Sequence, residues 1–158
     1  MGRGTSKLSG GAGGGAAAEI IQSPIATLQA AVADAQTRDL MGAYDLLKNK
    51  QLAKMSNEEK MVRAVVTDEL AERGNLLYDP KTGNYAKYDK PQEIVYNDGK
   101  SYRISGIENR SVYNFATNSY SDKAFANAEL YYNGKWAKVK NPDIEAALAV
   151  KYKQKRRS

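Results

Sequence analysis

Apolar residues recur at helical spacing through most of the first half of the chain. Ser23 followed by Pro24 is typical of a helix start, and the apolar positions after it repeat every three or four residues to about residue 36. A second apolar stripe runs from about residue 39 to 49. The segment Ser56-Asn57-Glu58-Glu59 is a capping box, and the helix behind it is expected to stop at Gly74. These amphipathic segments predict helices over residues 24–74 that must pack on another layer.

After Gly74 the pattern changes to alternation, and 12 of the 14 aromatic residues lie between residues 75 and 140, which favours antiparallel strands there. Turn residues predict a hairpin that joins residues 76–78 to 84–88, and a second that joins 93–96 to 101–104. Residues 110–116 are expected to form a further strand. Residues 118–128 are expected to form a loop with a short helical turn.

The strongest local signal is Asn133-Gly134, which is the preferred two-residue hairpin turn between alternating runs. Counting outward from it predicts the cross-strand pairs Tyr132 with Lys135, Tyr131 with Trp136, Leu130 with Ala137 and Glu129 with Lys138. We expect the face of Leu130, Tyr132, Ala137 and Val139 in the core. The face of Tyr131 and Trp136 is either covered by a second layer or open to a partner.

The predicted fold class is α+β, with N-terminal amphipathic helices packed on a Tyr-rich antiparallel sheet and a short C-terminal helix. Residues 1–22 are expected to form a flexible Gly-rich arm, because 7 of the 13 glycines lie in the first 15 residues. One domain is predicted over residues 23–152, with helices over 24–74, a sheet over 75–140 and a helix over 142–152. A basic tail is predicted over residues 153–158.

The order of three helices and a hairpin over about 65 residues is also similar to a winged helix-turn-helix. The helix that would read DNA carries Glu58, Glu59, Asp68 and Glu69, and this acidic face would repel phosphates. The α+β arrangement is therefore favoured.

Composition excludes many kinds of chemistry. The 158 residues contain no His and no Cys, which excludes Ser-His-Asp triads, thiolate nucleophiles and any metal site that is not made of oxygen ligands alone. We expect no enzyme activity, catalytic residue, metal or cofactor. No apolar run is long enough for a membrane span or a secretory signal, so a cytoplasmic location is expected.

Positive charge and aromatic residues are concentrated in the same part of the chain. Lys and Arg outnumber Asp and Glu by ten to seven over residues 75–140 and by five to two over residues 141–158, within a net charge of +6. Rings and cations together are typical of binding surfaces. The candidate partner-binding residues are Tyr131, Trp136, Lys135, Lys138 and Arg103, and the candidates for an electrostatic supplement toward nucleic acid are Lys155, Arg156 and Arg157.

The opening Met1-Gly2-Arg3-Gly4-Thr5-Ser6-Lys7, the Gly-rich leader, the Tyr-rich body and the basic end together resemble the small accessory proteins of bacteriophages and mobile elements. That resemblance implies either a protein that blocks a host enzyme or defence complex by binding it, or a minor virion component. We expect a non-enzymatic, phage-encoded binding module that inhibits a host protein or nucleoprotein complex in the host cytoplasm. The alternatives are a virion structural or assembly protein, and a basic, sequence-tolerant binder of RNA or single-stranded DNA.

Overall fold

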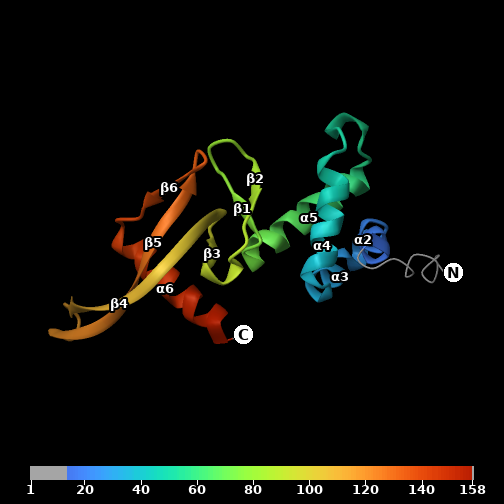
Figure 1. Cartoon of the computed structure of the whole chain (residues 1–158). Coiled ribbons are helices and arrows are strands. Elements are labelled where there is room, and N and C mark those ends of the chain that lie inside the picture. The colour runs from blue at the N-terminus through green and yellow to red at the C-terminus, as the bar shows by residue number, and fades with distance from the viewer. Residues whose placement is uncertain (1–13, 158) are drawn as a thin grey trace. The chain divides into compact units, whose positions relative to one another are not determined.

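The computed structural model describes residues 14–157, and over this range the fold class is α+β, as predicted (Figure 1). The chain divides into two compact units, Met1–Leu70 and Ala71–Ser158, where the sequence predicts one domain. Each unit buries apolar residues of its own, and one core cluster draws only on residues after Leu70.

The first unit is helical. Its elements are α2 (Gly14–Ile21), the 3-10 turn η1 (Ile25–Thr27), α3 (Leu28–Asp34), α4 (Thr37–Lys48), the 3-10 turn η2 (Leu52–Lys54) and the greater part of α5 (Asn57–Arg73). Helix α2 packs against α4 and buries Ala17 and Ile20. Residues 14–21 are thus helical where the sequence predicts a flexible arm, because their apolar side chains find a partner helix. The rest of the predicted arm, residues 1–13, lies outside the described residues.

The helix ends test the capping patterns. Around Ser56 the capping box is confirmed, since the Ser56 Oγ accepts the Glu59 N–H at 3.0 Å and the Glu59 Oε1 accepts the Ser56 N–H at 3.0 Å. Helix α5 ends before Gly74, whose φ of +87° favours glycine, also as predicted. The N-cap predicted at Ser23 is not observed at α3, whose N-cap residue is Thr27; the Ser23 hydroxyl instead donates to the Glu19 carbonyl of α2 at 3.0 Å.

The second unit contains two antiparallel sheets and a helix. Strands β1 (Leu76–Tyr78) and β2 (Tyr85–Lys87) form a two-stranded sheet. Strands β3 (Ile94–Asn97), β4 (Lys100–Asn114), β5 (Ser119–Tyr132) and β6 (Lys135–Lys138) form a four-stranded sheet in that order. The 3-10 turn η3 (Pro91–Glu93) precedes β3, and α6 (Pro142–Arg157) closes the chain.

The β5–β6 hairpin has the predicted register in all four pairs. The loop predicted over residues 118–128 is wrong, because residues 119–128 belong to β5, which pairs with β4 as far as Asn114↔Ser119. Most residues at this end are exposed, so burial does not impose the apolar and polar alternation by which strands are recognised. Figure 1 shows β4 and β5 running side by side beyond β3 and β6.

The core of the second unit lies where α6 packs on the sheet. It comprises Val95, Tyr102, Ile104, Ala126, Ala128, Val139, Leu148 and Ala149. The face expected in the core is therefore only half buried: Leu130 and Val139 join this cluster, whereas Tyr132 is 44% exposed and Ala137 is exposed. Helix α6 extends to Arg157, so residues 153–157 continue a helix where the sequence predicts a tail.

Candidate functional site

Three of the predicted partner-binding residues meet on one face of the four-stranded sheet. Tyr131 lies opposite Trp136 in the β5–β6 register, and Arg103 on β4 lies opposite Glu129 on β5. The Arg103 guanidinium stacks over the Trp136 ring at 4.2 Å, and the Tyr131 ring centroid is 5.3 Å from that of Trp136. Cross-strand pairing thus builds a cluster of two rings and one cation.

An ion pair fixes the guanidinium in this position. The Nε and one terminal nitrogen of Arg103 donate to the same Glu129 oxygen at 3.1 and 2.7 Å. The hydrogen bond to Glu129 raises the pKa of Arg103, so the side chain stays charged. Although it is paired, the Arg103 side chain keeps 32% of its surface exposed.

Tyr88 completes the cluster and was not singled out by the sequence, where it is one tyrosine among many. Its ring meets Trp136 edge-on at a centroid distance of 6.0 Å, and its hydroxyl donates to Glu93 at 2.8 Å. Burial, followed by the bond to Glu93, raises the pKa of the Tyr88 hydroxyl. The indole therefore has neighbours on several sides, yet Trp136 and Tyr131 remain partly exposed.

The turn that carries this cluster is held by Asp79, a second residue that the sequence did not reveal. Its two carboxylate oxygens accept the N–H groups of Asn133 and Gly134, each at 2.9 Å, and the side chain is only 4% exposed. Burial alone raises the pKa of Asp79, but the backbone donors of Asn133, Lys81 and Gly134 outweigh it and lower the pKa. Asp79 thus ties the β1–β2 hairpin to the β5–β6 turn.

Beside the stack lies an open hollow of about 390 Å³. Its lining includes Tyr88, Lys90, Glu93, Arg103 and Glu129. Its charges are two basic and two acidic side chains. Among the described residues, no group of three or more Asp or Glu side chains is placed to hold a metal ion.

The two predicted lysines of β6 fall on opposite faces of the sheet. Lys138 is exposed and shares the Trp136 face, because alternate residues of a strand point the same way. Lys135 is also exposed, but it pairs with Tyr132 on the other face. The structure therefore brings together Arg103, Tyr131, Trp136 and Lys138, and it separates Lys135 from them.

The predicted electrostatic supplement at the C-terminus is only partly available. The Lys155 ammonium points inward and donates to the carbonyl oxygens of Arg73, Pro91 and Ile94 at 3.2, 2.7 and 2.6 Å. Burial lowers its pKa, against the opposite effect of Glu72. Arg156 bonds the Tyr152 hydroxyl at 3.0 Å, and Arg157 is exposed. Lys155 is thus a structural residue, since it supplies donors to backbone oxygens.

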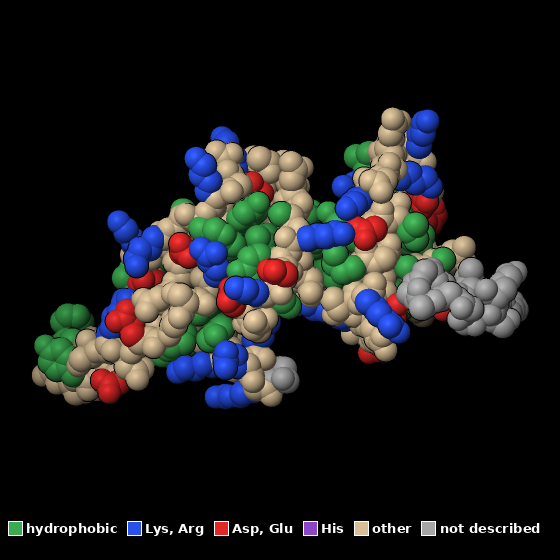
Figure 2. Space-filling view, in the orientation of Figure 1, with side chains coloured by type: hydrophobic (Ala, Val, Ile, Leu, Met, Phe, Trp, Pro, Cys, Tyr) green, Lys and Arg blue, Asp and Glu red, His purple; other side chains and the backbone are tan. Residues whose placement is uncertain are grey.

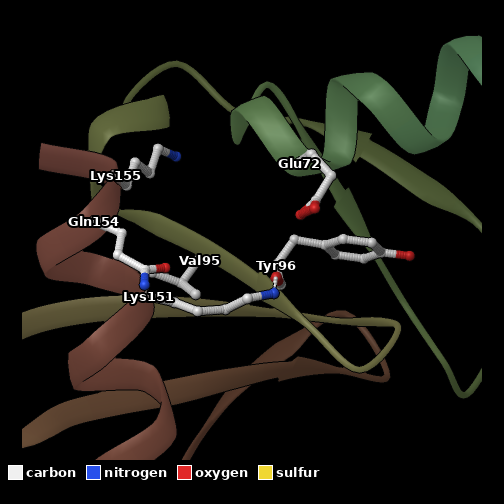
Figure 3. A pocket seen from close by; sticks show the side chains of 6 residues that line it. All are labelled: Glu72, Val95, Tyr96, Lys151, Gln154 and Lys155. Atoms are coloured by element: carbon white, nitrogen blue, oxygen red, sulfur yellow. Dashed lines mark hydrogen bonds between the residues drawn. The ribbon is translucent and has the colours of Figure 1, made fainter. Parts of the chain in front are cut away.

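A second hollow of about 220 Å³ lies where α6 meets β3 (Figure 3). Lys151 and Lys155 reach into it from α6, and Glu72 and Tyr96 line the other side. The Lys151 ammonium donates to the Tyr96 carbonyl at 3.0 Å, and Lys155 is engaged as described above. The ammonium groups of Lys151 and Lys155 already donate hydrogen bonds to backbone carbonyl oxygens, so the hollow is a weak candidate for an anion site.

The most exposed aromatic residues lie elsewhere, at the end of the paired strands β4 and β5. Phe115 is 88% exposed and Tyr120 is 70% exposed, and the end of this pair is prominently hydrophobic in Figure 2. The sequence analysis missed this feature because it expected a strand over residues 110–116 but a loop, and no partner strand, over residues 118–128. The signal that was present is a run of 11 residues, 111–121, with three aromatic and no charged side chains.

None of the helices in the described range combines the length and the apolar character that crossing a bilayer requires. In comparisons with known proteins, no family model, no curated sequence and no solved structure matches this chain.

Proposed function

We propose that this chain is a non-enzymatic binding module that docks on another protein through the open face of its four-stranded sheet. The docking residues are Arg103, Tyr131, Trp136 and Lys138, which we call the arginine–tryptophan surface. The observation that carries the proposal is the partly exposed stack of Arg103 on Trp136. Trp, Tyr and Arg are the residue types that contribute most to binding energy at protein interfaces.

The stack is also prepared for binding before a partner arrives. Glu129 holds Arg103 through two hydrogen bonds, and the rings of Tyr88 and Tyr131 flank the indole. Side chains that are already ordered lose little conformational entropy on association. A partner that docks on this surface therefore loses less free energy to ordering than it would on a surface of mobile side chains.

The balance of charge favours a protein over a nucleic acid as the partner. The hollow beside the stack is lined by equal numbers of basic side chains (Lys90, Arg103) and acidic side chains (Glu93, Glu129). A surface that binds phosphates needs an excess of cations. The resemblance to phage accessory proteins supports a host protein or nucleoprotein complex as the target, and an inhibitory effect of docking. Lys138 would then contribute electrostatic complementarity at the edge of the contact.

A matched pair of charge reversals tests this proposal. Lys138→Glu and Lys135→Glu change the same charge on the same strand, on exposed side chains of opposite faces. Each immobilised full-length variant is incubated with bacterial lysate treated with nuclease, and the captured protein is quantified against the unmodified chain. We expect Lys138→Glu to reduce capture at least tenfold and Lys135→Glu to leave it unchanged.

Two results would contradict the proposal. Equal capture by both variants would mean that the arginine–tryptophan surface is not the contact. Loss of every captured protein on nuclease treatment would favour the alternative of an RNA or single-stranded DNA binder. Trp136→Ala is a less specific probe, because the indole contacts Tyr88, Arg103 and Tyr131 and its removal also changes stability.

A further inference from the structure

Strands β4 and β5 project beyond the rest of their sheet as a two-stranded ribbon (Figure 1). Strand β3 pairs with β4 only up to Arg103, and β6 pairs with β5 only from Glu129 onward. Over residues 107–114 and 119–126 the two strands pair with each other, and within the described part of the chain their outer edges have no neighbouring strand. Such edges present backbone donors and acceptors to a second molecule.

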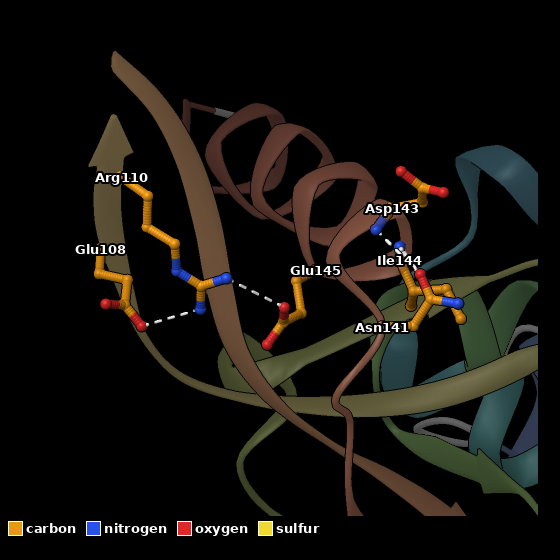
Figure 4. A network of polar contacts seen from close by, with 6 residues as sticks. All are labelled: Glu108, Arg110, Asn141, Asp143, Ile144 and Glu145. Atoms are coloured by element: carbon orange, nitrogen blue, oxygen red, sulfur yellow. Dashed lines mark hydrogen bonds and ion pairs between the residues drawn. The ribbon is translucent and has the colours of Figure 1, made fainter. Parts of the chain in front are cut away.

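The base of this ribbon is fixed to α6. Arg110 on β4 donates to Glu145 at 3.2 Å and to Glu108 at 3.0 Å, and its guanidinium lies over the Phe125 ring at 4.4 Å (Figure 4). Glu145 is only 7% exposed and lies in the first turn of α6. The hydrogen bond to Glu108, then that to Glu145, raises the pKa of Arg110. The ribbon therefore leaves the core from an anchored base.

The end of the ribbon carries an ordered aromatic cluster. The Tyr113 ring meets Phe115 and Tyr120 edge-on, at centroid distances of 4.8 and 5.0 Å. The turn between the strands is ordered by side chains: the Asn114 carboxamide oxygen accepts the Ala116 N–H at 2.9 Å, and the Tyr113 hydroxyl donates to the side chain of Asn118. The rings are therefore held in a fixed arrangement, although Phe115 is almost fully exposed.

The charge of the ribbon restricts the chemistry of its partner. Residues 111–121 carry no charged side chain, and on either side of them Arg110 and Lys123 balance Glu108 and Asp122. Nucleic acids and anionic bilayers attract Lys and Arg, which this end lacks. The free energy of transferring a phenyl ring out of water is most favourable when the ring enters an apolar recess.

We propose that the ribbon end is a second docking element, which inserts Phe115 and Tyr120 into an uncharged, apolar recess of the partner protein. This inference rests on the proposed function, because it requires that the chain acts by binding a protein. A second copy of the chain is a poor partner for the ribbon end, because its hollows are charged. The hollow beside Arg103 is lined by four charged side chains, and the hollow beside Lys151 by three.

A photo-crosslinker tests both the contact and its chemistry. The amino acid p-benzoylphenylalanine replaces Phe115 in one full-length protein and Tyr132, which is 44% exposed on the sheet, in a matched control. After irradiation in nuclease-treated bacterial lysate, we expect an adduct with another protein from position 115 and none from position 132. The crosslinked peptide of the partner should be apolar and uncharged. Adducts with nucleic acid, lipid or a second copy, or no adduct at all, would overturn the proposal.

A substitution separates this inference from the proposed function. Phe115→Ser should reduce the captured partner at least tenfold and leave the melting temperature unchanged, because the ring is 88% exposed. If Phe115→Ser retains full capture while Lys138→Glu loses it, the ribbon proposal fails and the arginine–tryptophan surface stands. The reverse result refutes that surface and leaves the ribbon as the contact.

Discussion

Replacing Lys155 by methionine should destabilise the second unit substantially, although Lys155 lies near the charged end of the chain. The substitution keeps an unbranched side chain and removes the ammonium, so the carbonyl oxygens of Arg73, Pro91 and Ile94 lose their common donor. Arg73 is the last residue of α5, where carbonyl oxygens have no partner within the helix. Lys155 therefore joins a helix end, a 3-10 turn and a strand through one charged group.

The magnitude follows from these bonds. A hydrogen bond to a charged group contributes about 1.5–3 kcal/mol, so three would sum to about 4.5–9 kcal/mol. The partial exposure of Lys155 screens its charge, and burial of the ammonium, which lowers its pKa, opposes the gain. We expect a loss of about 3 kcal/mol, equivalent to about 12–24 °C in melting temperature for a unit of this size.

The single tryptophan of the chain provides the assay. Trp136 lies in the second unit, so its fluorescence during urea titration reports the unfolding of that unit. The control is Lys153→Met, which removes the same charge from an exposed position of α6 and should change the free energy of unfolding by less than about 0.5 kcal/mol. If Lys155→Met were as stable as Lys153→Met, the three bonds would contribute no net stability and the reasoning would be wrong.

Two further predictions concern titration and truncation. Burial raises the pKa of Tyr102 and Tyr88 above the ordinary value of 10.0, so their contribution to stability is full below that pH and is lost as the pH rises through their folded values. An absorbance titration should show a late-ionising tyrosine component that is smaller in Tyr102→Phe than in the unmodified chain, and an unchanged titration curve in that variant would refute this. Deletion of residues 1–22 removes the buried Ile20 and should destabilise the first unit by about 2 kcal/mol, measured by circular dichroism, whereas deletion of residues 1–13 keeps α2. The shorter deletion is therefore the one that tests the assembly-arm alternative, and equal melting of both would contradict the packing of α2.

The features that the sequence predicted well are set by local interactions. The capping box at Ser56 depends on residues three positions apart, and the register of the last hairpin follows from the Asn133-Gly134 turn. That register also placed Tyr131 beside Trp136, which is half of the candidate site. Sequence alone was sufficient for these two features because the partners in each interaction are close along the chain.

The features that it missed depend on contacts between distant residues or on exposure. Nothing near Lys155 in the sequence indicates that its ammonium meets a carbonyl oxygen 82 residues away, so it was assigned to a basic tail. Asp79 likewise accepts hydrogen bonds from a turn 54 and 55 residues later. The β5 side of the ribbon end was taken for a loop because strands exposed on both faces show no alternation of polar and apolar residues.

The net charge of +6 is an incomplete guide to the partner, because several of the cations in the second unit are engaged within the protein. Arg103 is paired with Glu129, Arg110 bridges two glutamates, and Lys151 and Lys155 donate to backbone oxygens. A phosphate backbone would have to displace these contacts before it could bind these four cations. An apolar recess would displace nothing at Phe115, whose ring is already in solvent. The structure therefore favours recognition by rings over recognition by charge, and a steep dependence of partner binding on salt concentration would show that this reasoning is mistaken.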